Sequence, residues 1–192
     1  MIDKLVKHHT ILGIDPGTTY MGWALLQTEG GKAEVIDLGV LDLHKVEDHY
    51  QKLQQIFFFI TDMIDKYEPT EFSIETQFVD KNVQTMLRLA HGQGVAIAAA
   101  LAKDLPINEY SPLKIKMSIT GNGHASKEQV AGMLQRFLKI PDEMMPKKLD
   151  ATDALAIAYC HYLQLGSPLA EGTKYKNWAD FAKRNAGKVH GN

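Results

Sequence analysis

The chain has 192 residues, of which 45% are hydrophobic, and a formal net charge of −2 at pH 7. A chain of this length can bury one substantial core, so we expect a single α/β domain over residues 1–165 and a basic tail over residues 166–192. The longest apolar runs are far shorter than the roughly 18 residues that span a bilayer, and residues 1–10 lack the apolar region of a secretory signal. Cys160 is the only cysteine, which excludes an intrachain disulfide and favours a reducing, cytoplasmic location.

The net charge hides an asymmetry along the chain. Residues 1–75 carry 6 basic and 13 acidic side chains, whereas residues 76–148 carry 10 basic and 6 acidic ones, and residues 166–192 carry 5 and 2. Polyanion binding would therefore depend on the second half of the chain. Taken alone, the charge asymmetry is better explained by ordinary solvated surfaces than by polyanion binding.

The first 43 residues are typical of an antiparallel meander. Apolar or alternating segments cover residues 10–15, 21–27 and 34–43, and the Gly30-Gly31 pair predicts a hairpin turn between the last two. The chain therefore opens with three strands.

A helical crossover then leads to a fourth strand. Residues 46–67 have apolar side chains at helical spacing, and Glu71–Glu75 is typical of a short buried strand. Because such crossovers are right-handed, the fourth strand should lie parallel to the first in the same sheet. Asp15 and Glu75, at the ends of these two strands, should then lie side by side at the edge where open α/β sheets place their sites.

The rest of the chain alternates helices with one more strand. We expect a helix over residues 80–103, a strand over 105–110 and a second helix from Ser111-Pro112 to the loop Gly121–His124. A third helix should cover residues 126–138, with a Ser126/Gln129 capping box at its start. After a linker over residues 140–148, the last helix should cover residues 149–165. The predicted fold is α/β, with a five-stranded mixed sheet of three antiparallel strands and then parallel strands, flanked by helices. From Gly92 onward the 80–103 helix is small and apolar, so it should pack closely against its own sheet or a second subunit.

The last helix begins with two carboxylates. Asp150 and Asp153 are three residues apart and share one face, while Ala154, Leu155, Ile157 and Ala158 supply core material on the opposite side. Acids at a helix start often only complement the helix dipole. Together with two acids that end buried strands, however, they favour a functional site. Carboxylates that lie so near one another need cations between them to stay ionised.

Several motifs in a consistent order carry a resemblance to a known family. They are Gly13-Ile14-Asp15-Pro16-Gly17-Thr18, Gly22, Ile74-Glu75 with Phe78, Gly92-Gln93-Gly94-Val95-Ala96, Gly121-Asn122-Gly123 leading to Lys127, and Asp150-Ala-Thr-Asp153-Ala-Leu-Ala. Over residues 11–164 the sequence resembles the RuvC family of Holliday junction resolvases. The resemblance implies a ribonuclease H-like fold, a homodimer, a RuvA-RuvB branch-migration complex as partner, and symmetric Mg²⁺- or Mn²⁺-dependent cutting of four-way DNA junctions in recombination and repair.

The resemblance also implies roles for individual residues. The four catalytic acids fall on Asp15, Glu75, Asp150 and Asp153, the base-wedging aromatic on Phe78, and two DNA-contacting lysines on Lys116 and Lys127. Lys114 and Arg88 are weaker candidates for the same DNA surface. Phe78 could instead be a core residue, and His124 and His161 are weak candidates for a general base.

Oxygen ligands suit Mg²⁺ or Mn²⁺, and the sequence lacks a Cys/His cluster typical of zinc. Two such ions can activate a water for attack on phosphorus and stabilise the leaving 3′ oxygen. We expect Asp15 to bridge both ions, with Glu75 on one side and Asp150 or Asp153 on the other. Which member of the helix pair binds directly stays open.

Two other classes of protein remain alternatives. One is a catalytically silent scaffold that binds junctions. The other is an ATP-binding protein, because Asp15-Pro-Gly-Thr-Thr also resembles the first phosphate loop of the actin and sugar-kinase superfamily. That class needs a second phosphate loop on a duplicated domain, for which 192 residues leave no room.

Two further expectations concern assembly and the tail. The helix around Gly92 to Ala100, with its N-terminal turns, is the candidate dimer interface. In the tail, Trp178, Phe181 and Ala182 share helical spacing, so a short docked helix and a disordered DNA-binding tail are both compatible with the sequence.

Overall fold

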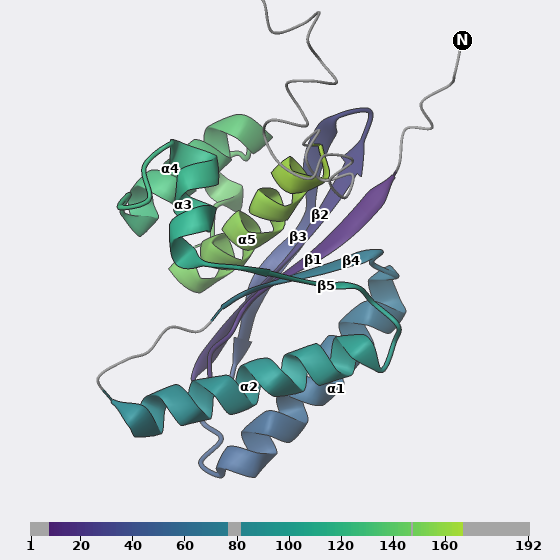
Figure 1. The fold of residues 1–192 in the computed structure, drawn as a ribbon, viewed down its shortest axis with the longest axis vertical. Helices are drawn as coiled ribbons and strands as arrows, with labels where there is room; N and C mark the ends of the chain where they lie inside the picture. Colours follow the sequence, from purple (N-terminus) through teal and green to yellow (C-terminus); the bar gives the residue numbers. More distant parts are fainter. Residues whose placement is uncertain (1–7, 77–81, 147, 167–192) are drawn as a thin grey trace, which may run out of the picture.

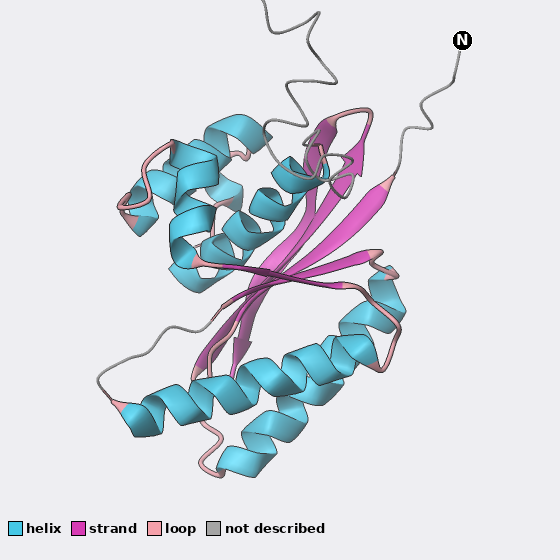
Figure 2. Ribbon diagram, in the orientation of Figure 1, coloured by secondary structure: helices cyan, strands magenta, loops and turns pink. Residues whose placement is uncertain are grey.

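The computed structural model describes residues 8–76, 82–146 and 148–166. The elements in chain order are β1 (His9–Asp15), β2 (Tyr20–Glu29), β3 (Lys32–Asp42), α1 (His49–Tyr67), β4 (Glu71–Glu75), α2 (Val83–Leu101), β5 (Ile107–Tyr110), α3 (Pro112–Thr120), α4 (Lys127–Leu138), the 3-10 turn η1 (Asp142–Met144) and α5 (Leu149–Leu165). A five-stranded sheet crosses the middle of the molecule, with helices on both sides (Figure 1, Figure 2).

The sheet has the predicted mixed topology, with strand order β3-β2-β1-β4-β5. β1, β2 and β3 pair antiparallel, whereas β4 pairs parallel with β1 and with β5. The hairpin between β2 and β3 turns at Gly30 and Gly31, whose φ angles are 62° and 77°. Two consecutive positive φ values favour glycine, as the sequence indicated.

Two hydrophobic clusters separate the faces of the sheet. Leu12 and Ile14 pack with α1 and α2, whereas Ile11 packs with α3, α4 and α5. This alternation is the two-residue period of a strand. It turns Gly13 and Asp15 toward α5, which lies against β1 and β2.

The helices agree with the sequence prediction apart from the ends of α1 and α2. α1 begins at His49 rather than at residue 46, because the Asp48 side chain accepts a hydrogen bond from the backbone N–H of Gln51 and caps the helix. α2 is shorter than predicted, beginning after Asn82, whose side chain caps it in the same way. The predicted capping box of α4 is present.

α5 corrects the expectation of a helix with one core face. Its buried residues lie on most sides of the helix and are Ala151, Thr152, Ala154, Leu155, Ala156, Ile157, Ala158, Cys160 and His161. The reason is its position between the sheet and the α3–α4 pair, which covers the side that a surface helix would expose to water. Cys160 is buried, as predicted.

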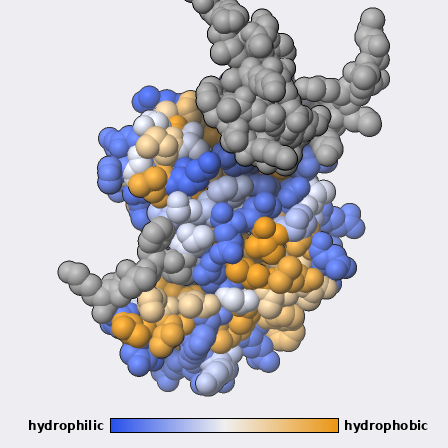
Figure 3. All heavy atoms as spheres, in the orientation of Figure 1, coloured by the Kyte–Doolittle hydropathy of each residue, from blue (hydrophilic) through white to orange (hydrophobic). Residues whose placement is uncertain are grey.

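The small residues of α2 pack within the chain. Gly92, Ala96, Ala99 and Ala100 are buried, and a Cβ at Gly92 would lie 3.5 Å from side-chain atoms of Ile56 in α1 and of Thr18. Larger apolar side chains of α1 and α2 are exposed instead, namely Tyr50, Phe57, Phe58, Val83, Leu87 and Leu101. Figure 3 shows hydrophobic patches over the half of the molecule that holds these two helices.

No helix within the described ranges is long and apolar enough to cross a membrane. The predicted tail starts at residue 166, and residues 167–192 lie outside the described part of the chain.

Candidate active site

Three elements bring the predicted acids toward one another. Asp15 ends β1 and Glu75 ends β4, and these neighbouring parallel strands pair with Ile14 opposite Ile74. Ile14 and Ile74 are buried in the cluster on the α1–α2 side, so the next residue on each strand faces α5. Asp153 comes from the first turns of α5.

These side chains line a common pocket of about 160 Å³. Asp15, Glu75 and Asp153 share it with Lys116 of α3 and Lys127 of α4, and its apolar wall consists of Pro112, Ile115, Val130 and Ala156. The structure therefore brings together three of the four predicted acids and both predicted lysines.

Asp150 is not among the residues that line this pocket. It nevertheless lies close enough for its charge to contribute to the raised pKa of Asp15 and to that of Lys127. The fourth acid thus flanks the site at the N-terminus of α5.

Two glycines allow the backbone of α5 to lie in close contact with the sheet. A Cβ at Gly22, which pairs with Asp15, would lie 1.9 Å from the Asp150 carbonyl oxygen, and one at Gly13 would lie 2.5 Å from that of Ala154. Any side chain at either position would therefore push the helix, and its two acids, away from β1.

Burial and mutual repulsion make the carboxylates hard to ionise. Burial, followed by the charges of Asp153 and Glu75, raises the pKa of Asp15 to about 8. Burial and the charge of Asp153 raise the pKa of Glu75 to about 7. The pKa of Asp153 is also raised, chiefly by burial. The pocket therefore favours additional positive charge at neutral pH.

Lys127 supplies part of that charge. Its ammonium group forms an ion pair with Asp153. Burial alone would lower the pKa of Lys127, but the hydrogen bond to Asp153 and the nearby negative charges outweigh it, so the pKa is raised. Lys127 therefore stays protonated and reduces, without cancelling, the negative charge of the pocket.

The pocket fits a hard divalent cation in donor chemistry. All its acidic donors are carboxylate oxygens, the ligands that Mg²⁺ and Mn²⁺ prefer. In the described residues, however, no three His, Cys, Asp or Glu side chains lie close enough together to hold a metal ion. Binding would thus need the carboxylates to draw closer, which like charges resist until a cation neutralises them.

The remaining predicted site residues lie elsewhere. Lys114 is exposed on α3, and Arg88 is exposed on α2 near His49, whose pKa is lowered first by burial and then by the charges of His91 and Arg88. Phe78 lies outside the described residues. His124 is exposed in the loop before α4 and does not line the acidic pocket.

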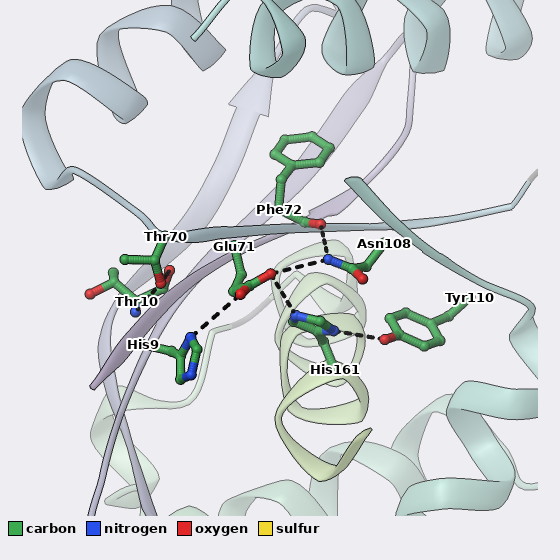
Figure 4. A network of polar contacts seen from close by, with 8 residues as sticks. All are labelled: His9, Thr10, Thr70, Glu71, Phe72, Asn108, Tyr110 and His161. Carbon is green, nitrogen blue, oxygen red and sulfur yellow. Dashed lines mark hydrogen bonds and ion pairs between the residues drawn. The ribbon is translucent and has the colours of Figure 1, made fainter. Parts of the chain in front are cut away.

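His161 belongs to a separate polar network, shown in Figure 4. Its ring contacts the Tyr110 hydroxyl at 2.7 Å and the Glu71 carboxylate at 3.3 Å. The same carboxylate lies 3.4 Å from His9 and accepts a hydrogen bond from Asn108. His161 is 3% exposed, and burial lowers its pKa. This network ties α5 to the sheet away from the acidic pocket.

Sequence reasoning missed two contacts near the site. One is the Lys127–Asp153 ion pair. The other is the position of Lys148, whose ammonium nitrogen lies 3.4 Å from the centroid of the Tyr20 ring. Neither pair shows a signal in the sequence, because the partners come from separate elements.

Comparison with known proteins supports one family over most of the chain. The family model described as "Crossover junction endodeoxyribonuclease RuvC" matches residues 11–161. The proteins of that name from Porphyromonas gingivalis and Bacteroides fragilis are 53% and 54% identical, over 95% and 96% of this chain and 98% and 97% of theirs.

Solved structures give the same result for the fold. T. thermophilus RuvC in complex with a Holliday junction substrate is 27% identical, with a TM-score of 0.75 over 83% of this chain and 97% of that one. The yeast mitochondrial Holliday junction resolvase Ydc2 is 16% identical, with a TM-score of 0.63 over 79% and 77% of the two chains, and shows a likeness of fold alone. The mixed sheet, flanked by helices as in RuvC, is the predicted ribonuclease H-like fold. With the family model matching most of its length, the chain belongs to the RuvC family of crossover junction endodeoxyribonucleases.

Proposed function

We propose that this protein resolves four-way DNA junctions by paired symmetric nicks, through metal-dependent hydrolysis of phosphodiester bonds in recombination and repair. The observation that carries the proposal is the pocket in which Asp15, Glu75 and Asp153 meet with raised pKa values. It lies in a member of a family of metal-dependent nucleases, and one structural neighbour is a complex with a Holliday junction substrate. Relatives named as endonucleases favour this over a catalytically silent scaffold.

The four acids are the proposed metal ligands. Asp15 ends the middle strand of the sheet and shares the pocket with Glu75 and Asp153, so it would suit a ligand shared by two Mg²⁺ ions, with Mn²⁺ as a substitute. When bound, such ions activate a water and stabilise the leaving oxygen. Between Asp150 and Asp153, pocket lining favours Asp153 as the direct ligand.

The basic residues are proposed to position the DNA. Lys116 and Lys127 line the pocket and would neutralise a phosphate there without reading sequence. Lys114 and Arg88, exposed and outside the pocket, would contact more distant phosphates. For Phe78, the proposed role is to wedge between bases where the junction opens.

Symmetric cutting requires two copies of the site, which a C2 homodimer supplies. The exposed apolar residues of α2, including Val83 and Leu87 in its N-terminal turns, support an interface there. We propose that the dimer acts in the cytoplasm, where it meets chromosomal DNA, with a RuvA-RuvB branch-migration complex delivering the junction.

Asp15→Asn tests the proposed function. The variant should lose Mg²⁺-dependent nicking of a synthetic four-way junction by roughly 10³-fold, because a neutral amide cannot hold a cation as a carboxylate does. Junction binding, measured in Ca²⁺ by fluorescence anisotropy, should be retained.

Asp62→Asn is the matched control, because Asp62 is an exposed residue of α1 away from the pocket. It should nick as the unchanged protein does. Equal activity of Asp15→Asn would refute the assignment, and a parent protein that binds junctions but cuts none with Mg²⁺ or Mn²⁺ would identify a scaffold.

A further inference from the structure

A second cationic group lies beside the acidic pocket, on the strands that the pocket does not use. Lys148 precedes α5 and contacts two residues that pair across β2 and β3, Tyr20 and Asp42. Its ammonium nitrogen lies 3.4 Å from the centroid of the Tyr20 ring and 3.8 Å from the Asp42 carboxylate. A ring face and a carboxylate therefore hold a flexible lysine in one place.

The held ammonium keeps its hydrogen-bonding capacity. Among the described residues, Lys148 makes an ion pair longer than a hydrogen bond and a contact with a ring, and its side chain is 47% exposed. An ammonium has three N–H donors. Lys127 differs, because it already donates a hydrogen bond to Asp153.

Asp42 is engaged mainly with another residue. Its carboxylate accepts hydrogen bonds from the side chain and backbone N–H of His44, and these lower the pKa of Asp42 more than the Lys148 charge does. Asp42 thus positions the ammonium without saturating it.

The sheet topology places this lysine relative to the acids. Tyr20 stands on the same face of β2 as Gly22, two residues along, and Gly22 pairs with Asp15 and touches the Asp150 backbone. β2 lies on one side of β1 and β4 on the other. Lys148 therefore flanks Asp15 on the β2 side, whereas Lys116 and Lys127 share the pocket with Glu75 of β4.

We propose that Lys148, held by Tyr20 and Asp42, binds a backbone phosphate of the junction strand next to the phosphate that is cut. The inference rests on the proposed function and adds a DNA contact to it. A strand crossing the site from β4 toward β2 meets cations on both sides of the carboxylates, which offset their repulsion of the backbone. Because the side chain is already ordered, less conformational entropy is lost on binding.

The test is the salt dependence of junction binding by Lys148→Gln, measured by anisotropy in Ca²⁺ over a series of KCl concentrations. Affinity should fall roughly fivefold at moderate salt, and the slope of log K against log salt should shrink by about 0.9, the value for one lost phosphate contact. Lys148→Arg, which keeps the charge, should retain the slope.

Lys32→Gln is the matched control, because Lys32 lies at the hairpin turn that ends the same strand pair, away from Tyr20 and Asp42. It should keep both affinity and slope. Tyr20→Phe, which keeps a ring face, should bind as the unchanged protein does, whereas Tyr20→Leu should lose part of the affinity.

Each outcome separates this inference from the function on which it rests. If the unchanged protein neither binds nor nicks the junction, the proposed function fails. If it does both while Lys148→Gln retains the full slope, whether or not affinity falls, Lys148 contacts no phosphate and only this inference is overturned.

Discussion

At the scale of single residues, the pocket concentrates acids where burial makes their charge costly. Asp15 and Glu75 both have pKa values raised by burial first and by neighbouring carboxylates second. A folded state that holds such groups is less stable when they ionise, unless cations compensate. The ionised acids thus lower the stability of the folded protein but give the pocket affinity for cations.

The raised pKa values predict that the stability of the folded protein depends on pH. Because the pKa of Asp15 rises from 3.8 to about 8, the folded state binds more protons than the unfolded state between these values. The free energy of unfolding therefore falls as pH rises through that window. In EDTA, the Tm of Asp15→Asn minus the Tm of the unchanged protein should increase by roughly 5 °C from pH 5 to pH 8.

The companion measurement adds Mg²⁺ at pH 8. It should raise the Tm of the unchanged protein, because a ligand that binds only the folded state stabilises it, and it should raise that of Asp15→Asn far less. A Tm difference between the two proteins that is independent of pH would contradict the pKa shift.

At the scale of elements, the position of α5 decides the site. The helix carries Asp150 and Asp153 and packs against β1, β2 and β3 as well as α3 and α4. Its approach to β2 depends on Gly22, where even a methyl group would meet the Asp150 carbonyl.

Gly22→Ala should therefore damage both stability and activity. The backbone of α5 has to move, at a cost of about 1–3 kcal/mol in the free energy of unfolding, and nicking should fall with it as the acids are displaced. Urea unfolding and the junction assay measure the two effects.

Gly132→Ala in α4 is the matched substitution, because nothing lies within 4 Å of a Cβ there. It should stabilise the protein by about 1 kcal/mol through helix propensity and leave nicking unchanged. Equal responses of the two variants would show that close approach at Gly22 is unimportant.

At the scale of the whole molecule, the two faces of the sheet have different surfaces. On one side α3, α4 and α5 complete the acidic pocket. On the other side, α2 buries its small residues against α1 and the sheet, and both helices expose large apolar side chains, such as Phe58, Val83 and Leu87. Exposed apolar area of this kind is consistent with the proposed dimer interface.

Leu87→Glu tests the proposed dimer. Leu87 is 45% exposed, so the substitution should leave the fold intact while a buried charge at the interface opposes association. Sedimentation should show a monomer, and paired nicking should become single, uncoupled nicks.

The control for this variant is Met144→Glu, an exposed apolar position in η1. It should remain dimeric and cut as the unchanged protein does. A Leu87→Glu protein that sediments as a dimer would place the interface elsewhere.

Much of the architecture follows from local patterns in the sequence. The Glu71–Glu75 strand and the Leu149–Leu165 helix match the prediction residue for residue, because each has a clear periodicity and clear breaks at both ends. The handedness of the crossover then places Asp15 beside Glu75 without knowledge of any other contact. The membership of the family likewise rests on motifs that are visible in the sequence.

Other features depend on how separate elements meet, and only the tertiary structure decided them. Lys127 reaches Asp153 across 26 residues of chain, Gly22 touches the backbone of Asp150, and Lys148 settles on Tyr20. Periodicity reports which face of an element is buried but not which partner covers it, so it could not show that α5 is enclosed on most sides. Residue types and spacing determine the elements and the candidate acids. The distances between elements determine how readily those acids ionise and which side chains they contact.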